Sequence, residues 1–187
     1  MSKEHKFGGP TIAMHWLMAV LVLGAFATGL EGHDEVIFGA EGLFDRQLHE
    51  TLGLAVFVLL GVRVVMRLLG RKPEPVDMPR WMHILSKATQ GFLYLLMIAV
   101  PMLGMIGSGS EGHTVDLIGG ITLMPPIKVE ADLLALHKLA GDAILWLAGL
   151  HAAAALFHHF ILRDGVLASM LPASISSKLP GGVTSGH

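Results

Sequence analysis

The sequence predicts an all-α integral membrane protein folded as a four-helix bundle, and three observations support this fold class. Of the 187 residues, 52% are hydrophobic and only 15% are charged, whereas a soluble domain carries about a quarter charged residues. The mean hydropathy is +0.61. The apolar residues also gather in four long blocks, each able to cross a hydrocarbon core of about 30 Å as a helix. Together these features exclude a soluble globular domain and an intrinsically disordered chain.

The first two blocks are Thr11–Leu30 and His49–Leu69. The first contains 20 residues and no Asp, Glu, Lys or Arg. Because no small-residue cleavage site follows it, we expect a retained helix rather than a signal peptide. The second contains Arg63 and Arg67 near its end. Long basic side chains can reach the membrane surface from a helix end, so these arginines are compatible with a span.

The third block, Ala88–Ile106, has 19 uncharged residues and includes Pro101, which a packed membrane bundle tolerates. The fourth, Leu133–Leu162, exceeds a simple span and is expected to tilt or to project beyond the membrane. Gly, Pro and acidic residues mark the connections on one side as loops. We therefore expect a tail at 1–10, a transmembrane domain at 11–170 and a flexible tail at 171–187.

The distribution of Lys and Arg predicts the orientation of the bundle. Ten of the 13 lie in the two tails and at the connection between the second and third blocks. Because positive residues gather on the cytoplasmic side, both termini are expected in the cytoplasm. The ten are Lys3, Lys6, Arg63, Arg67, Arg71, Lys72, Arg80, Lys87, Arg163 and Lys178, and the three on the outer side are Arg46, Lys128 and Lys138.

Histidine is unusually frequent, with 11 copies, whereas cysteine is absent. The lack of cysteine excludes disulfides, iron–sulfur clusters and thiolate metal sites. The net charge of −2 gives no support for nucleic-acid binding. Five histidines fall in loops, tails or at the inner interface and need no special role: His5, His33, His83, His113 and His187.

The other histidines lie within the apolar blocks or at their ends. Ionisable residues in a bilayer are costly and usually functional, although a hydrogen bond between helices is an alternative for any one of them. These six are His15, His49, His137, His151, His158 and His159.

Depth and helix phase group these histidines into pairs. His137 and His151 are 14 residues apart, which is about 21 Å and nearly four turns, so both face the same side of the fourth helix. His49 lies near the outer surface and is expected opposite His137. His15 lies near the cytoplasmic surface, opposite His151. Spacing alone leaves His158 open as the partner of His15, because it follows His151 by seven residues on nearly the same face.

Two facing imidazoles suit a haem iron that is held on both axial sides. Such an iron has no open position, so the chemistry predicted is electron transfer. Cores of helix bundles commonly hold cofactors between facing helices. The alternative from another class is a histidine-lined metal-ion transporter, which would need carboxylates deep in the bundle, and the first and third blocks contain none.

Several segments in register resemble the bacterial cytochrome b561 family over residues 11–172. The segments are Ile12–Leu17, His49–Gly53, Tyr94–Gly104, Leu150–Leu156, His158–Phe160 and Arg163–Gly165. The resemblance implies a multi-pass protein of the bacterial inner membrane with two haem b groups. It implies His15, His49, His137 and His151 as the axial ligands, and leaves His158 and His159 as interface or quinone-site candidates.

Characterised relatives of this compact type are described as superoxide oxidases, in which superoxide reduces the outer haem and ubiquinone accepts the electron at the inner end. The resemblance therefore implies a superoxide:ubiquinone oxidoreductase. Lys138, next to His137, is the candidate for steering the superoxide anion, although the outer connections are mainly acidic and oppose such steering. The alternative is a haem-b membrane subunit that relays electrons between quinone and a partner redox subunit, such as a periplasmic dehydrogenase, or a small carrier.

Four further side chains are candidates for supporting the cofactors. Arg63 and Arg67 lie one turn apart, suitably placed for haem propionates or a quinone headgroup, or simply as positive-inside anchors. Glu50 and Asp142 lie near the outer pair and are expected either to orient a ligand imidazole or to be exposed to water. The sequence departs from the family at Gln90, where many members carry a histidine.

Overall fold

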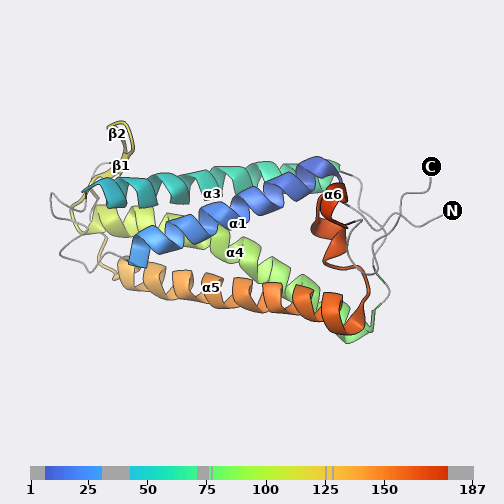
Figure 1. Ribbon diagram of the computed structural model, residues 1–187. Helices are drawn as coiled ribbons and strands as arrows, with labels where there is room; N and C mark the ends of the chain where they lie inside the picture. The colour runs from blue at the N-terminus through green and yellow to red at the C-terminus, as the bar shows by residue number, and fades with distance from the viewer. Residues whose placement is uncertain are drawn as a thin grey trace.

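Four long helices form the body of the computed structural model, which describes residues 7–30, 43–70, 76, 78–124, 126–127 and 129–176 (Figure 1). Each helix is long and apolar enough to cross a membrane. The four predicted spans are thus confirmed, and the chain is a multi-pass membrane protein. The helices are α1 (Gly9–Leu30), α3 (Leu43–Leu69), α4 (Arg80–Ser110) and α5 (Leu133–Phe157). The candidates His5, His33, His187, Lys3, Lys6, Arg71, Lys72, Lys128 and Lys178 lie outside the described residues.

Two helices extend beyond the apolar blocks that predicted them. Helix α3 begins at Leu43, before His49, and carries Asp45 in its first turn, where a carboxylate favours the positive end of the helix dipole. Helix α4 begins directly after Pro79 and runs through Pro101 to Ser110. Hydropathy marks only the part of a helix that matches the hydrocarbon, so polar turns at either end escape it.

Helix α5 has well-defined ends. The side chain of Asp132 accepts a hydrogen bond from the backbone N–H of Ala135 at 2.9 Å and caps the first turn. The helix continues as a π-helical turn, η2 (His158–Leu162), and stops at Arg163, whose φ of 54° is left-handed. The whole helical segment therefore ends at Leu162, as the sequence predicts.

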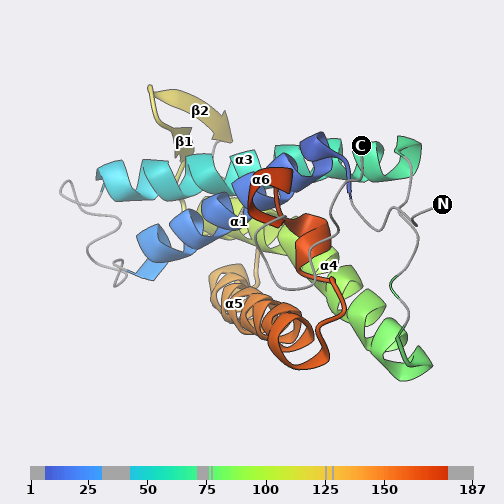
Figure 2. The ribbon, with the colours of Figure 1, turned by 45° about the vertical axis from the view of Figure 1, so that its right-hand side comes forward.

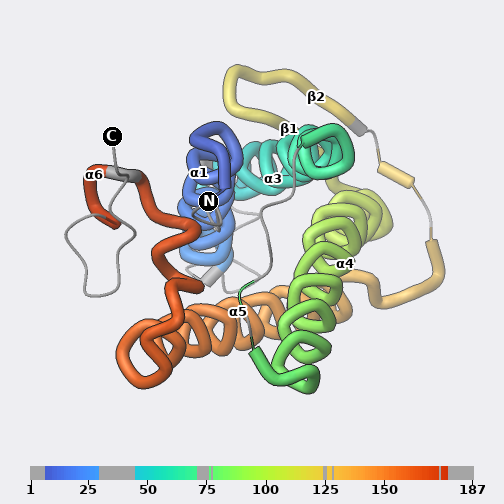
Figure 3. Tube along the Cα trace, turned by 90° about the vertical axis from the view of Figure 1, so that its right-hand side faces the viewer, coloured from blue at the N-terminus to red at the C-terminus, as the bar shows by residue number. Residues whose placement is uncertain are grey.

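The helices pack as two pairs. Helix α1 lies along α3 and α4 lies along α5, while a smaller contact between α3 and α4 joins the pairs (Figures 2 and 3). Met18, Val56 and Leu60 are buried where α1 meets α3, and Tyr94 and Met97 of α4 pack against them. Helix α5 approaches α1 and α3 much less closely than it approaches α4.

The end of the bundle where α1 begins is called here the terminal end. A segment after α5 folds back at this end and includes a 3-10 turn, η3 (Ala168–Met170), and a short helix, α6 (Ala173–Ser176) (Figure 1). The indole N–H of Trp16 donates to the carbonyl of Met170 at 2.9 Å, which ties the returning segment to α1. The tail expected from residue 171 thus begins with a helical turn, and residues 177–187 lie outside the described residues.

The opposite end, called here the hairpin end, carries two short antiparallel strands, β1 (Val115–Leu117) and β2 (Ile121–Met124). Gly119 and Gly120 form the turn with φ values of 95° and 77°, which glycine adopts readily. Strand β1 packs against α3. The sequence predicts only a loop here, because three- and four-residue strands leave almost no periodic signal.

Candidate functional site

Four histidines from three helices meet as two facing pairs. At the hairpin end, the rings of His49 on α3 and His137 on α5 have centres 5.7 Å apart. At the terminal end, the ring centres of His15 on α1 and His151 on α5 are 6.3 Å apart. In each pair the ring planes are 82° apart. The structure therefore brings together the two pairs expected from depth and helix phase, and it places His151 beside His15.

The two histidines at the hairpin end are each oriented by a backbone carbonyl of the neighbouring helix. Nδ1 of His49 lies 2.7 Å from the carbonyl oxygen of Ala25 on α1. Nδ1 of His137 lies 2.8 Å from the carbonyl oxygen of Val100 on α4. Because a carbonyl can only accept, Nδ1 is the donor in both rings. Each neutral ring therefore keeps its lone pair on Nε2, the form that binds a metal.

Two glycines make these hydrogen bonds sterically accessible. Gly29 and Gly104 each follow the accepting residue by four positions, so their own N–H groups bond the same carbonyls within the helix. A Cβ on Gly104 would lie 2.9 Å from Cε1 and Nδ1 of His137. A Cβ on Gly29 would lie 3.1 Å from Cε1 of His49. Glycine at these positions therefore lets each ring approach the helix surface and share the carbonyl.

The spacing of both pairs fits a haem iron bound between them. An imidazole nitrogen lies about 2 Å from its metal and about 1 Å from its own ring centre, so two imidazoles on opposite sides of one iron have centres about 6 Å apart. The observed values, 5.7 and 6.3 Å, agree with this distance. The donor chemistry also agrees, since Nδ1 is engaged by a carbonyl at the hairpin end and Nε2 remains as the ligand atom.

The terminal end differs, because a guanidinium lies beside its histidine. Nη2 of Arg63 is 3.4 Å from Nδ1 of His15. Nε of Arg63 donates to the hydroxyl of Tyr94 at 3.0 Å. Nη1 of Arg63 is buried without a hydrogen-bond partner. An unpaired buried donor of a charged group is costly, so this nitrogen is suited to an anionic acceptor.

Arg67 is exposed one turn further along α3. Its guanidinium lies 5.9 Å from the centre of the Tyr94 ring, within the range of a cation–π contact. Nη2 of Arg67 also donates to the side-chain oxygen of Gln90 at 3.5 Å, and the amide of Gln90 donates to Ser86 at 3.0 Å. Gln90, the position where the sequence departs from the family, thus belongs to a polar chain on the surface of the terminal end.

Of the two alternatives expected for Glu50 and Asp142, orienting a ligand imidazole is wrong for both, and exposure to water is confirmed for Asp142. Both imidazoles at that end donate to backbone carbonyls instead. The carboxylate of Glu50 accepts from the backbone N–H of Asp116 at 2.7 Å, and Asp142 is exposed on α5. Glu50 therefore holds the β-hairpin against α3 in the helical turn that contains His49.

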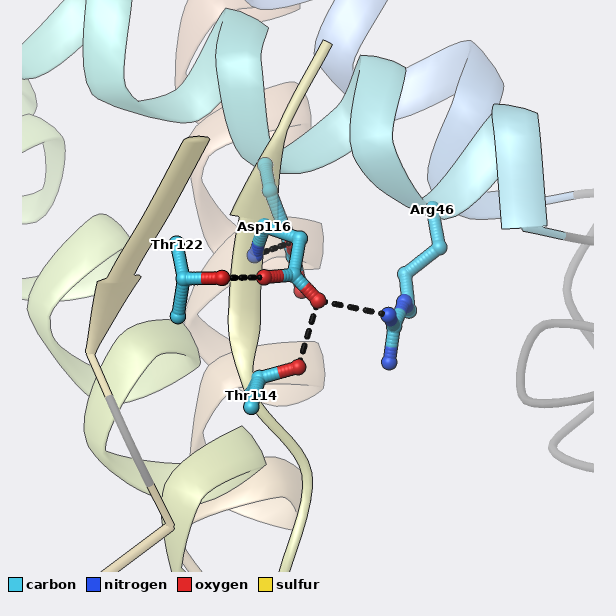
Figure 4. A network of polar contacts seen from close by, with 5 residues as sticks. Arg46, Thr114, Asp116 and Thr122 are labelled. Carbon is cyan, nitrogen blue, oxygen red and sulfur yellow. Dashed lines mark hydrogen bonds and ion pairs between the residues drawn. The ribbon is translucent and has the colours of Figure 1, made fainter. Parts of the chain in front are cut away.

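Asp116 is the centre of a polar network that fastens the hairpin to α3 (Figure 4). One of its carboxylate oxygens accepts from the hydroxyl of Thr122 at 2.6 Å, and the other accepts from Thr114 and lies 3.4 Å from Nη2 of Arg46. The hydroxyls of Thr114 and Thr122, followed by the charge of Arg46, hold the pKa of Asp116 below its usual value of 3.8. The charge of Arg46 is thereby largely offset.

The remaining histidines have other surroundings. His158 bonds through Nδ1 to the carboxylate of Asp164, and Asp164 also accepts from the backbone N–H of Val166 at 3.1 Å. His159 is buried and contacts the ring of Phe160. The ring that faces His15 across the bundle is that of His151.

Sequence reasoning missed three parts of this site: the accepting carbonyls, Tyr94 and the hairpin network. Carbonyl partners leave no side-chain signal in a sequence. Gly29 and Gly104 each lie within an apolar block, and small residues inside membrane helices often mark places where two helices approach closely. Their positions were therefore an available sign of these contacts. Tyr94 is the single tyrosine of the chain and lies in the middle of an apolar span, which was a second available sign.

Membrane-crossing helices with facing histidine pairs define a class of protein, the membrane b-type cytochromes. This chain belongs to the prokaryotic cytochrome b561 family, whose profile matches residues 6–173. It is 34% identical to cytochrome b562 of Cereibacter sphaeroides over 91% of this chain and 98% of that protein. It is 30% identical to probable superoxide oxidase CybB of Yersinia pestis over 89% of this chain and 96% of that protein. Cytochrome b561 homolog 2 of Escherichia coli is 29% identical, over 91% and 94%.

Replacing Gly104 by alanine should lower the haem content of the purified protein. The new Cβ would lie 2.9 Å from the His137 ring and displace it from the Val100 carbonyl. The matched control is Gly91→Ala on the same helix, where a Cβ meets nothing within 4 Å and helix propensity improves. We expect Gly91→Ala to keep the normal ratio of haem to protein in absorption spectra. Full haem content in both variants would show that His137 needs no glycine beside it.

Replacing Asp116 by asparagine should speed amide hydrogen exchange in residues 115–124 at neutral pH. The ionised carboxylate is favoured in the folded hairpin, since its pKa is lowered. Its stabilisation is therefore present above pH 3.8 and is lost as the pH falls through the lowered folded pKa. Wild type and variant should accordingly converge in acid. Asp142→Asn, which changes an exposed carboxylate on α5, should leave hairpin exchange unchanged. Equal exchange of wild type and Asp116→Asn at neutral pH would contradict the anchoring role.

Proposed function

We propose that this protein carries two haem b groups and transfers electrons across the bacterial inner membrane between a periplasmic donor and the quinone pool. His49 and His137 would be the axial ligands at the hairpin end, and His15 and His151 those at the terminal end. The proposal rests on one observation: two imidazole rings lie opposite each other at each end of the bundle. Their centres are 5.7 Å apart at the hairpin end and 6.3 Å apart at the terminal end. His137 and His151 are separated by about 21 Å along α5, so the two sites together reach across most of the membrane.

Haem iron accounts for the site better than a transported metal ion. Within the described part of the chain, no three His, Cys, Asp or Glu side chains come together to hold a metal ion. Two nitrogen ligands on opposite sides suit an iron whose other four ligands come from a porphyrin. Haem bound in this way supplies one-electron transfer. The protein's part is to hold the imidazoles and to set the charge around them.

We assign the terminal end to the cytoplasm and the hairpin end to the periplasm. The support is the distribution of basic residues: Arg63, Arg67, Arg80 and Lys87 all lie toward the terminal end of α3 and α4. Cytoplasmic ends of membrane helices are enriched in Lys and Arg. With this orientation the β-hairpin and the His49–His137 pair face the periplasm.

Superoxide is the donor we favour and ubiquinone the acceptor, which makes the protein a superoxide:ubiquinone oxidoreductase. The support is the likeness to probable superoxide oxidase CybB of Yersinia pestis. Two superoxide anions would become two O₂ and release two electrons, and one ubiquinone would take these electrons with two protons to give ubiquinol. Lys138 is exposed next to His137 and would attract the anion. Arg46 contributes little to that attraction, since Asp116 offsets its charge.

Three side chains at the terminal end are proposed to bind haem propionates or the quinone. Arg63 is the strongest of them, because its buried Nη1 has no partner and a carboxylate would supply one. Arg67 is exposed and suits either this role or that of a membrane-surface anchor. His158, held by Asp164, is suited to passing a proton to a quinone at this end.

A second candidate function is a membrane subunit that relays electrons between quinone and a periplasmic dehydrogenase or carrier. The observation that favours it is the apolar exposure of the hairpin. Ile118, Ile121 and Leu123 are 43%, 60% and 44% exposed on a segment beyond the membrane helices. Apolar side chains in such a place are suited to contact with a protein partner.

The haem assignment predicts a low-spin b-type spectrum and two haems per chain. His151→Ala should remove one haem, because that side chain faces His15, whereas His158→Ala should keep both. His113→Ala, outside the spans, serves as the control and should also keep both. Reduced-minus-oxidised spectra and haem-to-protein ratios measure these outcomes. A protein without haem, or the loss of a haem in His158→Ala only, would contradict the assignment.

The superoxide assignment predicts fast haem reduction when superoxide is mixed with the purified protein in a stopped-flow instrument. Lys138→Gln should slow this reduction several-fold at low salt, and the difference should shrink as salt screens the charge. Lys87→Gln removes an exposed lysine at the other end and should leave the rate unchanged. If superoxide fails to reduce a protein that holds both haems, the relay function becomes the better description.

A further inference from the structure

The two ends of the bundle differ in what lies beside Nδ1 of His49 and His137 on one side and Nδ1 of His15 on the other. At the hairpin end, Nδ1 of His49 and Nδ1 of His137 donate to carbonyl oxygens at 2.7 and 2.8 Å. At the terminal end, Nδ1 of His15 lies 3.4 Å from a guanidinium nitrogen of Arg63. At the hairpin end both rings therefore have a carbonyl dipole beside Nδ1, whereas at the terminal end His15 has a cationic guanidinium beside it.

A carbonyl that accepts the Nδ1–H makes an imidazole a stronger electron donor through Nε2. Stronger donation favours the oxidised, more positive form of a bound haem iron and lowers its reduction potential. Both ligands at the hairpin end have such a partner. The charge of Lys138 next to His137 opposes this effect weakly, because that side chain is exposed to a high-dielectric surrounding.

Arg63 acts in the opposite direction at the terminal end. Guanidinium stays charged, and its nearest nitrogen lies 3.4 Å from the His15 ring, so it places a positive charge next to this site. Reduction removes one positive charge from a haem, and a neighbouring cation favours the reduced form. Arg63 is partly buried and fixed by Tyr94, so solvent screens it less than it screens exposed Arg67. If a haem propionate pairs with Arg63, replacing the arginine would leave the negative charge of the propionate without a counter-ion. The reduced form of the haem would then still be less favoured than in the wild type.

We infer that the His15–His151 site has the higher reduction potential, and that the positive charge of Arg63 beside His15 sets this order. The inference rests on the proposed function, in which both pairs hold haem. His49 and His137 would then hold the haem that gives up one electron and is oxidised, and His15 and His151 would hold the haem that gains this electron and is reduced. No bond forms or breaks and no proton moves. The structure thus favours electron flow from the hairpin end to the terminal end.

The first test assigns the potentials without changing Arg63. Potentiometric titration of the purified holoprotein, followed by haem absorption, should show two one-electron steps. His49→Ala should remove the lower step and keep the higher, and His15→Ala should do the reverse. A remaining step of low potential in His49→Ala would overturn the inference while leaving the two-haem assignment intact. A wild-type protein without two haems would instead contradict the proposed function.

The second test removes the charge. Arg63→Gln should lower the higher step and shift the electron equilibrium between the two haems at least tenfold toward the hairpin end, which is about 59 mV for a one-electron couple. Arg63→Lys should keep most of the wild-type value. Lys87→Gln is the matched control, since it removes an equal charge from an exposed position at the same end of the bundle. An unchanged or raised higher step in Arg63→Gln, or an equal shift in Lys87→Gln, would overturn the role of Arg63.

Discussion

The hydrogen bond from an imidazole Nδ1–H to a helix carbonyl is the interaction on which the hairpin end of this bundle depends. A helix carbonyl already accepts one bond from the N–H four residues later and has a second lone pair to offer. The side chain of that later residue normally covers the lone pair. Glycine at positions 29 and 104 removes the cover, so His49 docks on α1 and His137 docks on α4. These two bonds leave Nε2 of each ring as the nitrogen that is not engaged by a carbonyl, and the ring centres lie 5.7 Å apart.

The same hydrogen bond occurs once in each helix pair, and His15 at the terminal end has a different neighbour beside its Nδ1. There the bundle places a cation beside His15 instead of a carbonyl. Arg63 is fixed in turn by Tyr94 of α4, which belongs to the packed core around Leu60. The guanidinium of Arg63 is therefore fixed by Tyr94, a residue of the packed core where α4 meets α1 and α3. Under the proposed function, two equivalent sites would pass electrons in either direction with equal ease, whereas these unequal surroundings would give the transfer a direction.

Much of this arrangement was predictable from the sequence, because hydropathy locates membrane helices and the period of 3.6 residues locates a face. Those two rules place His137 and His151 on one side of α5 at opposite depths, and the structure brings them beside His49 and His15. Periodicity did not separate His151 from His158, since both lie on nearly the same face. The two histidines differ in their partners, because His158 bonds to Asp164. Asp164 follows Arg163, whose left-handed backbone conformation ends the helix. A contact of that kind depends on the exact path of a helix end and has no periodic signature.

The wrong expectation for Glu50 has the same physical origin. A carboxylate beside a ligand histidine in sequence points to a different part of the helix surface, because neighbours on a helix lie about 100° apart. Glu50 therefore faces the hairpin and accepts the N–H of Asp116, while Thr51 accepts the N–H of Ile118 at 3.0 Å. The residues directly after His49 thus hold the structure that covers this end of α3, and Arg46, one turn earlier, is bound to the same hairpin. Under the proposed function, an electron donor at this end would meet a surface on which Arg46 is already engaged by Asp116, so selection of the donor would rest on the shape of the hairpin as well as on charge.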